Sequence, residues 1–260
     1  RDGEVRETIN MAISREQTAQ DIFNAVGIDQ KILSIKLRQI LETDNKITAS
    51  TLSMELYNAF ETINTPGKDL ALAALRTVQN NGVTICEADG IAVFKDRRLV
   101  GYLTPEEAKY YLFCIDSVQG GVFTFSHTGE GKDDVTLEIN ECQTKRSVEN
   151  RDGQVGIHIS VQMYTFLDEI MNPDVQLNDA MIIELEELAS KKLRKDIGDL
   201  IKKVQSEYGA DIFGFGDLIH RTDPQLWDQL KDRWDSLFRT LEVKVETDVH
   251  IINTGAICKS

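Results

Sequence analysis

Strict alternation of apolar and polar residues in two stretches, 135–139 and 155–163, is the feature that most restricts how this chain can fold. A period of two is that of a β-strand, whose successive side chains point to opposite faces of a sheet. With a further strand over 120–127, these stretches predict an antiparallel meander with one buried face. The inward-facing residues are Val135, Leu137, Ile139, Val155, Ile157, Ile159, Val161 and Met163.

The buried face of this sheet requires covering helices. An apolar stripe at helical spacing predicts a helix of about 30 residues that begins at Asn178 or Asp179. A second helix is expected with Thr222 as N-cap and Pro224 in its first turn, followed by a strand over 241–251. The order β-β-β-α-α-β predicts an α+β domain, an antiparallel sheet with helices packed on one face. The apolar residues of the second helix are Trp227, Leu230, Trp234 and Phe238, which we expect to anchor the core.

The chain before residue 28 is expected to form a strand over 8–13 and then a helix. Ser14 and Gln17 have the spacing of a capping box, and Gly27 is placed to end the helix.

Residues 70–102 change to strand patterns. Asn80-Asn81-Gly82 and Lys95-Asp96-Arg97 separate apolar runs and predict two hairpins. Thr104 and Glu107 then form a second capping box with a proline between them, so a helix begins there. Gly120-Gly121 offers a domain boundary.

The composition excludes several classes of protein. With 43 acidic against 29 basic residues, the chain has a net charge of -14, which makes nucleic acid an unfavourable partner. No apolar run approaches the ~18 residues of a membrane span, and the first ten residues lack the apolar core of a signal peptide. As given, the chain is expected to be soluble.

The four cysteines give no support for a metal centre. Cys86, Cys114, Cys142 and Cys258 lie far apart without a C-x-x-C pair, so we expect no zinc site and no cofactor. Cys142 follows the outward parity of its strand, and its disulfide state stays open.

The stretch 211–216, DIFGFG, allows three interpretations: a phosphate-binding loop, an aromatic contact loop, or a turn between helices. A dinucleotide loop needs a preceding strand and a third glycine, which are missing, and Asp211 and Asp217 would repel phosphate. We therefore expect Gly214 and Gly216 to supply positive φ angles for a turn pinned to the core by its phenylalanines. An exposed phenylalanine would instead make the loop a contact site. The candidate interaction residues are Phe213, Phe215, His220 and Arg221.

No arrangement of residues in the sequence predicts catalysis. His158 and His250 both follow the outward parity of their strands and can lie on one sheet face, but no nucleophile motif accompanies them. The acidic clusters around residues 184–187 and 228–235 have the spacing of solvated helix faces.

Three segments taken together resemble the Ger(x)C family, the C subunits of bacterial spore germinant receptors. They are residues 1–23, 89–108 and 209–255, in the order and spacing of the family. The last is the most specific, because it combines DIFGFG, the pair Trp227 and Trp234, and the I-x-x-x-G motif that ends at Gly255.

The resemblance implies a non-enzymatic lipoprotein on the outer face of the inner spore membrane, working with two membrane-embedded subunits, A and B. It implies three small α+β domains, of which 1–27 would be the end of the first, 28–118 the middle domain and 119–260 the third. The family's lipid-accepting cysteine, its signal peptide and most of its first domain have no counterpart in the residues given, so we expect an N-terminally truncated fragment of such a protein. Arg1, Asp2 and Arg6 would mark an ion pair near the end of the first domain.

We therefore expect a binding or scaffold module needed for spore germination, with no catalytic, cofactor or metal residues. The alternatives are direct binding of the germinant, which predicts a pocket with convergent polar groups, and hydrolysis of cortex glycan by two carboxylates.

Overall fold

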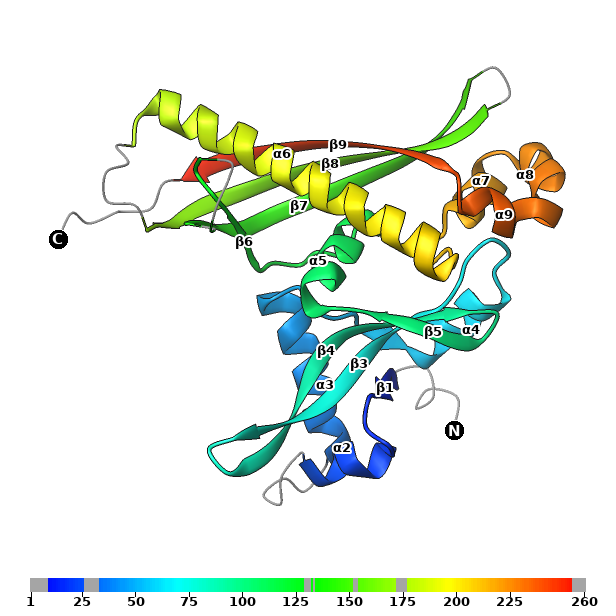
Figure 1. Ribbon diagram of the computed structural model, residues 1–260, viewed down its shortest axis with the longest axis horizontal. Coiled ribbons are helices and arrows are strands. Elements are labelled where there is room, and N and C mark those ends of the chain that lie inside the picture. Colours follow the sequence, from blue (N-terminus) through cyan, green and yellow to red (C-terminus); the bar gives the residue numbers. More distant parts are fainter. Residues whose placement is uncertain are drawn as a thin grey trace. The chain divides into compact units, whose positions relative to one another are not determined.

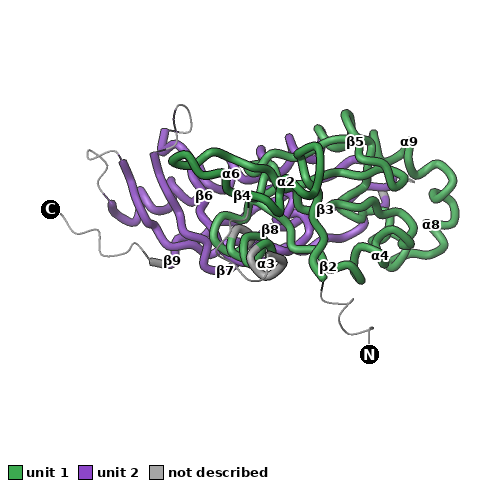
Figure 2. The backbone as a smooth tube through the Cα atoms, turned by 90° about the horizontal axis from the view of Figure 1, so that it is seen from below, with its two compact units in different colours: residues 1–109, 203–241 green, residues 110–202, 242–260 purple. Residues whose placement is uncertain are grey.

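The computed structural model describes residues 9–25, 33–128, 132, 134–151, 154–171 and 177–253 (Figure 1). The chain forms two compact units: unit 1 comprises residues 1–109 and 203–241, and unit 2 comprises residues 110–202 and 242–260 (Figure 2). The predicted α+β class is confirmed. The three family domains are a different division of the chain and stay a prediction. Arg1, Asp2, Arg6, Gly27 and Cys258 lie outside the described residues.

Unit 1 contains a five-stranded sheet of order β2-β1-β3-β4-β5. β1 runs parallel to β3, and the other neighbours are antiparallel. Both predicted hairpins are confirmed, with positive φ at Asn81 and Gly82 in one turn and at Asp96 and Arg97 in the other. The strands are β1 (Asn10–Ser14), β2 (Met54–Glu55), β3 (Ala71–Asn80), β4 (Val83–Lys95) and β5 (Arg98–Leu103).

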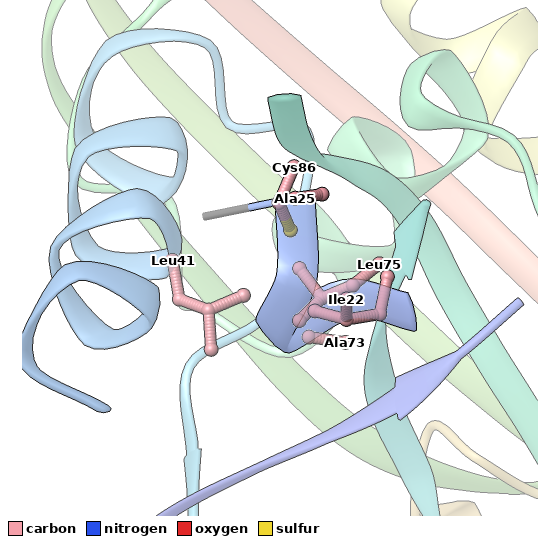
Figure 3. Close-up of a cluster of buried hydrophobic side chains, with 6 residues drawn as sticks. All are labelled: Ile22, Ala25, Leu41, Ala73, Leu75 and Cys86. Carbon is pink, nitrogen blue, oxygen red and sulfur yellow. The ribbon is translucent and has the colours of Figure 1, made fainter. Parts of the chain in front are cut away.

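Helices α2 (Ala19–Ala25) and α3 (Leu33–Ile47) cover part of this sheet. Figure 3 shows Leu41 reaching from α3 toward Ile22 of α2, beside Ala73 and Leu75 of β3. All four side chains are buried, so this cluster fixes the two helices on the strands.

The two predicted capping boxes have different outcomes. Thr104 and Glu107 satisfy each other's backbone amides at 2.9 and 3.2 Å, as predicted, and α5 (Pro105–Cys114) follows. The box at Ser14 was wrong, because Ser14 is the last residue of β1 and pairs with Leu75. Thr18 and Asp21 make the box at the start of α2 instead.

Unit 2 is built on a four-stranded sheet of order β6-β7-β8-β9. Its first three strands form the predicted meander, but β9 pairs with β8 in parallel, so the sheet is mixed and not wholly antiparallel. The chain between β8 and β9 is a long helical crossover, and such a connection returns a strand in the same direction. The strands are β6 (Val122–Phe125), β7 (Val135–Arg151), β8 (Gln154–Ile170) and β9 (Glu242–Asn253).

Helix α6 (Asp179–Lys203) confirms the predicted apolar stripe and also protects the sheet edge. Its buried residues are Leu185, Ala189, Leu193, Ile197, Leu200 and Ile201. Ser190 Oγ accepts from the amide of Val249 at 3.0 Å, and Glu186 Oε1 accepts from that of Ile251 at 2.7 Å. These bonds give partners to edge amides of β9 that would otherwise face solvent.

The second predicted helix is broken into short pieces that belong to unit 1. They are α8 (Pro224–Leu230), the 3₁₀ turn Lys231–Arg233 and α9 (Trp234–Phe238), and helix α7 (Phe215–Thr222) precedes them. The predicted N-cap, Thr222, was wrong by one residue, because Asp223 accepts from the amide of Leu226 at 3.0 Å. The apolar anchors Trp227, Leu230, Trp234 and Phe238 are buried, as predicted.

DIFGFG forms a turn between helices. The π-helical turn Val204–Tyr208 ends at Gly209, and Gly214, with φ 72°, is the N-cap of α7. Phe213 and Phe215 are 1% and 0% exposed, and their rings stack at 5.1 Å. Gly216 is inside α7, so its predicted positive φ was wrong. A side chain is excluded there because an added Cβ would lie 2.7 Å from the Cα of Gly67.

The buried carboxylate of Asp211 caps α7. Its oxygens accept from the amides of Phe215 at 3.0 Å and Gly216 at 2.8 Å, so they occupy the helix terminus that a phosphate would need. The Asp211 amide donates to the Asp69 carboxylate at 2.7 Å, and the Asp69 amide donates to the Asp211 carbonyl at 2.9 Å. The turn 66–69 is thereby tied to the DIFGFG loop.

The close approach of Gly67 and Gly216 gives a first prediction. Gly67→Ala should lower the free energy of unfolding by at least about 3 kcal/mol, because its Cβ would meet Gly216 backbone and the Trp227 ring within 2.7 Å. Gly82→Ala is the matched control: it also has positive φ, but no atom lies within 4 Å, so about 1–2 kcal/mol is expected. Urea denaturation measures both; equal losses would contradict the close approach.

A second prediction concerns pH. Burial raises the pKa of Asp211 from its ordinary 3.8 to about 7, although the amides of Gly216 and Phe215 lower it. Between these values the folded chain holds a proton that the unfolded chain has lost, so this carboxyl's stabilising contribution declines as pH rises from about 4 to about 7. The free energy of unfolding of the wild type, relative to Asp211→Asn, should fall over that range in urea titrations. A pH-independent difference would show that Asp211 titrates normally.

Candidate functional site

A charged cleft of about 540 Å³ lies within unit 1. It is bounded by the turn 66–69, the β4–β5 turn and the helices α7 to α9. Its size falls within the range of ligand pockets in proteins. The lining residues are Pro66, Gly67, Lys68, Asp69, Lys95, Asp96, His220, Trp227, Asp228, Lys231, Asp232, Trp234 and Asp235.

Two tryptophans form the aromatic part of the lining. Trp227 and Trp234 are each 5% exposed and meet edge to face at 5.5 Å. His220 lies 5.9 Å from the ring of Trp227. The indole N–H of Trp234 is buried and has no acceptor among the described residues. An unsatisfied buried donor of this kind is costly.

Lys95 holds the two walls of the cleft together. Its ammonium lies 3.1 Å from Asp69 Oδ2 and 2.6 Å from Asp235 Oδ1. Burial lowers the pKa of Lys95, but the hydrogen bonds and charges of Asp235 and Asp69 outweigh it and leave the pKa raised. Burial also raises the pKa of Asp69, against the opposing effect of Lys95. The cationic form of Lys95 is therefore strongly favoured.

Lys68 differs from the other lysines of the cleft. It is half-buried, and its methylene groups lie 3.2–3.5 Å from the position of a Cβ on Gly214. Its ammonium makes no ion pair with any residue that the structure describes. Lys231, by contrast, pairs with Asp228 at 2.8 Å. Among the described residues, Lys68 is thus the lysine of the cleft that is left to meet a ligand.

The structure places the four predicted interaction residues in different settings. Phe213 and Phe215 are buried and hold the turn, while His220 is half-buried and lines the cleft. Arg221 is exposed and pairs with Asp217 at 3.0 Å. Their role in binding stays a prediction, and only His220 and Arg221 offer surface for it.

The two strand histidines share one sheet face but are not neighbours. His158 lies opposite Lys244 and His250 opposite Tyr164, six residues further along β8. Glu246 lies 3.0 Å from His158 and 2.6 Å from Lys244, whereas His250 lies 3.0 Å from Asp248. The two histidines therefore belong to separate charged groups.

Cys86, Cys114 and Cys142, the cysteines in the described part of the chain, form no disulfide. Cys86 and Cys114 are buried and Cys142 is half-buried; burial raises the pKa of Cys114 and of Cys142 to about 12, so both are protonated at neutral pH. Within the described ranges, no three His, Cys, Asp or Glu side chains are grouped so as to hold a metal ion. Of the helices in those ranges, not one has the length and apolar character needed to cross a membrane.

Of the residues that line the cleft, the sequence pattern singled out only His220 for interaction, and the cleft as a site was missed. Its residues come from three separate segments, 66–69, 95–96 and 220–235, and each looks like an ordinary turn or solvated helix face. Two of these segments, 95–96 and 220–235, lie within the stretches that carry the family resemblance.

Comparison with known proteins gives consistent matches. Residues 89–255 match the family model described as spore germination B3/GerAC-like, C-terminal, and residues 1–77 match that of a spore germination protein N-terminal domain. The chain is 27% identical to spore germination protein KC of Bacillus subtilis over 98% of its own length and 66% of that protein. It is 30% identical to spore germination protein B3 of the same organism, over 66% of its length and 46% of that protein.

Among solved structures, the chain is similar to the crystal structure of the GerBC protein. The TM-score is 0.75 at 25% identity, covering 97% of this chain and 71% of that one. The chain spans less than two thirds of the length of the curated relatives KC and B3. Since the B3/GerAC-like model alone matches well over half of the residues, the resemblance to the Ger(x)C proteins is confirmed and this chain belongs to the spore germination B3/GerAC-like family.

Proposed function

We propose that this chain acts in spore germination as part of a C subunit of a nutrient germinant receptor, as a non-enzymatic binding or scaffold module. The observation that carries the proposal is the likeness to the GerBC protein over nearly the whole chain. The KC and B3 relatives are likewise named as germination proteins. We further propose that the partners of the chain are membrane-embedded A and B subunits. The full-length protein would be anchored by a lipid to the outer face of the inner spore membrane.

A protein-binding role requires exposed anchors, and helix α4 (Leu56–Asn64) offers two. Tyr57 and Phe60 are each 59% exposed, and their spacing of three places them on one helix face. Exposed aromatic residues are enriched among the side chains that dominate binding energy at protein interfaces. Ile9, 47% exposed, precedes β1 and accepts from the Leu56 amide, so it adds apolar surface next to the start of α4.

Of the alternatives, direct binding of a small molecule has one supporting observation, the charged cleft. Glycan hydrolysis is not proposed, because nothing about the described carboxylates singles out an acid and a nucleophile.

The third prediction tests the scaffold role by co-purification of the chain with detergent-solubilised A and B subunits. The wild-type chain should be retained, and Tyr57→Ser combined with Phe60→Ser should weaken retention at least about 30-fold, as expected for two interface anchors. Arg221→Ala tests the exposed residue that the sequence pointed to.

Val83→Ser is the matched control, because Val83 is 60% exposed but lies in the β3–β4 hairpin. Its retention should equal that of the wild type. A wild-type chain that is not retained would contradict the subunit role of these residues, and a control that loses as much as the double variant would contradict the role of α4. Phe215→Ala is unsuitable here, since that side chain is 0% exposed and its loss would act on stability.

A further inference from the structure

We propose that the cleft of unit 1 binds a small zwitterion, a molecule that carries one ammonium and one carboxylate group. The inference concerns residues of this chain alone and does not depend on the scaffold role. It rests on the positions of Lys68, Asp232, Asp235 and the two tryptophans, all of which line the cleft.

The carboxylate of the ligand would meet Lys68. This lysine is half-buried beside Gly214, and its ammonium has no ion-pair partner within the described part of the chain. An ammonium without an ion-pair partner gains a charged hydrogen bond from a carboxylate placed beside it. The stem of Lys68 already lies across the backbone of Gly214, so little freedom remains to be lost on binding.

The ammonium of the ligand would meet the acidic wall. Asp235 is shared with Lys95, and Asp232, one turn earlier along the helical segment, makes no ion pair with any described residue. Five aspartates face three lysines in the lining, so the cleft has a surplus of negative charge. A ligand with only a negative charge would be repelled by the aspartates, and a ligand with only a positive charge would leave Lys68 without a partner. A zwitterion can pair its carboxylate with Lys68 and its ammonium with the aspartates.

The tryptophans favour the same class of ligand. An ammonium is attracted to an indole face, and Trp227 and Trp234 are the aromatic part of the lining. A volume of about 540 Å³ accommodates a molecule with a few carbon atoms between its two charges.

The experiment is a fluorescence titration with glycine, β-alanine and 5-aminovalerate, whose charges are separated by increasing lengths of chain. The protein has two tryptophans and both line the cleft, so the emission reports on this site. At least one of the three should give a saturable change below about 10 mM, confirmed by calorimetry. Propionate and propylamine carry one charge each. They should bind at least about tenfold more weakly, because each lacks one of the two charged hydrogen bonds.

Two variants assign the charges. Lys68→Met keeps the methylene stem and removes the ammonium, and Asp232→Asn keeps the shape and removes the charge; each should weaken binding at least about tenfold. Lys195→Met is the control, since Lys195 is a solvated residue of α6 outside the cleft, and it should bind as the wild type does. Melting temperatures establish that each variant is folded.

No saturable response with any of the three zwitterions would overturn the proposal. Equal binding of propionate or propylamine, or undiminished binding by Lys68→Met, would overturn it as well. None of these results bears on retention by receptor subunits, so failure of the ligand proposal and failure of the scaffold proposal remain distinguishable.

Discussion

The arrangement of unit 1 around the cleft depends on the hydrogen bonds of the buried Asp211 carboxylate at the start of α7. A buried carboxyl is costly unless its oxygens are hydrogen-bonded, and here they accept from the amides of Phe215 and Gly216. Burial raises its pKa to about 7, so protonation removes part of that cost at neutral pH. The same residue is bonded through its backbone to Asp69, which joins the helix start to a turn far away in the sequence.

This junction explains why the cleft exists. Gly67 and Gly216 allow the two backbones to approach where any side chain would collide, and Lys95 bridges Asp69 and Asp235 across the opening. The aspartate therefore has a structural role in the DIFGFG loop. The Asp211 carboxylate occupies the N-terminus of α7, and the charged residues nearby line the cleft.

The two surfaces of unit 1 suit different partners. Tyr57 and Phe60 on α4 offer exposed aromatic area of the kind used between proteins, whereas the cleft offers opposite charges around a buried aromatic floor. Membership of the B3/GerAC-like family supports a role in germination, and the proposed scaffold and ligand-binding roles use different surfaces. Both activities are compatible in one chain, because no residue of one surface belongs to the other.

The sequence by itself determined the α+β class, the meander of unit 2, the stripe of α6, both hairpins and the Thr104 capping box. These features depend on residues a few positions apart, whose periodicity and capping chemistry act locally. Only the tertiary structure decided the parallel direction of β9, the division of the second helix, the close approach that requires Gly216 and the cleft. The physical reason is sequence distance: Asp211 bonds to Asp69 across 142 residues and Lys95 pairs with Asp235 across 140, so no local pattern could reveal either partner.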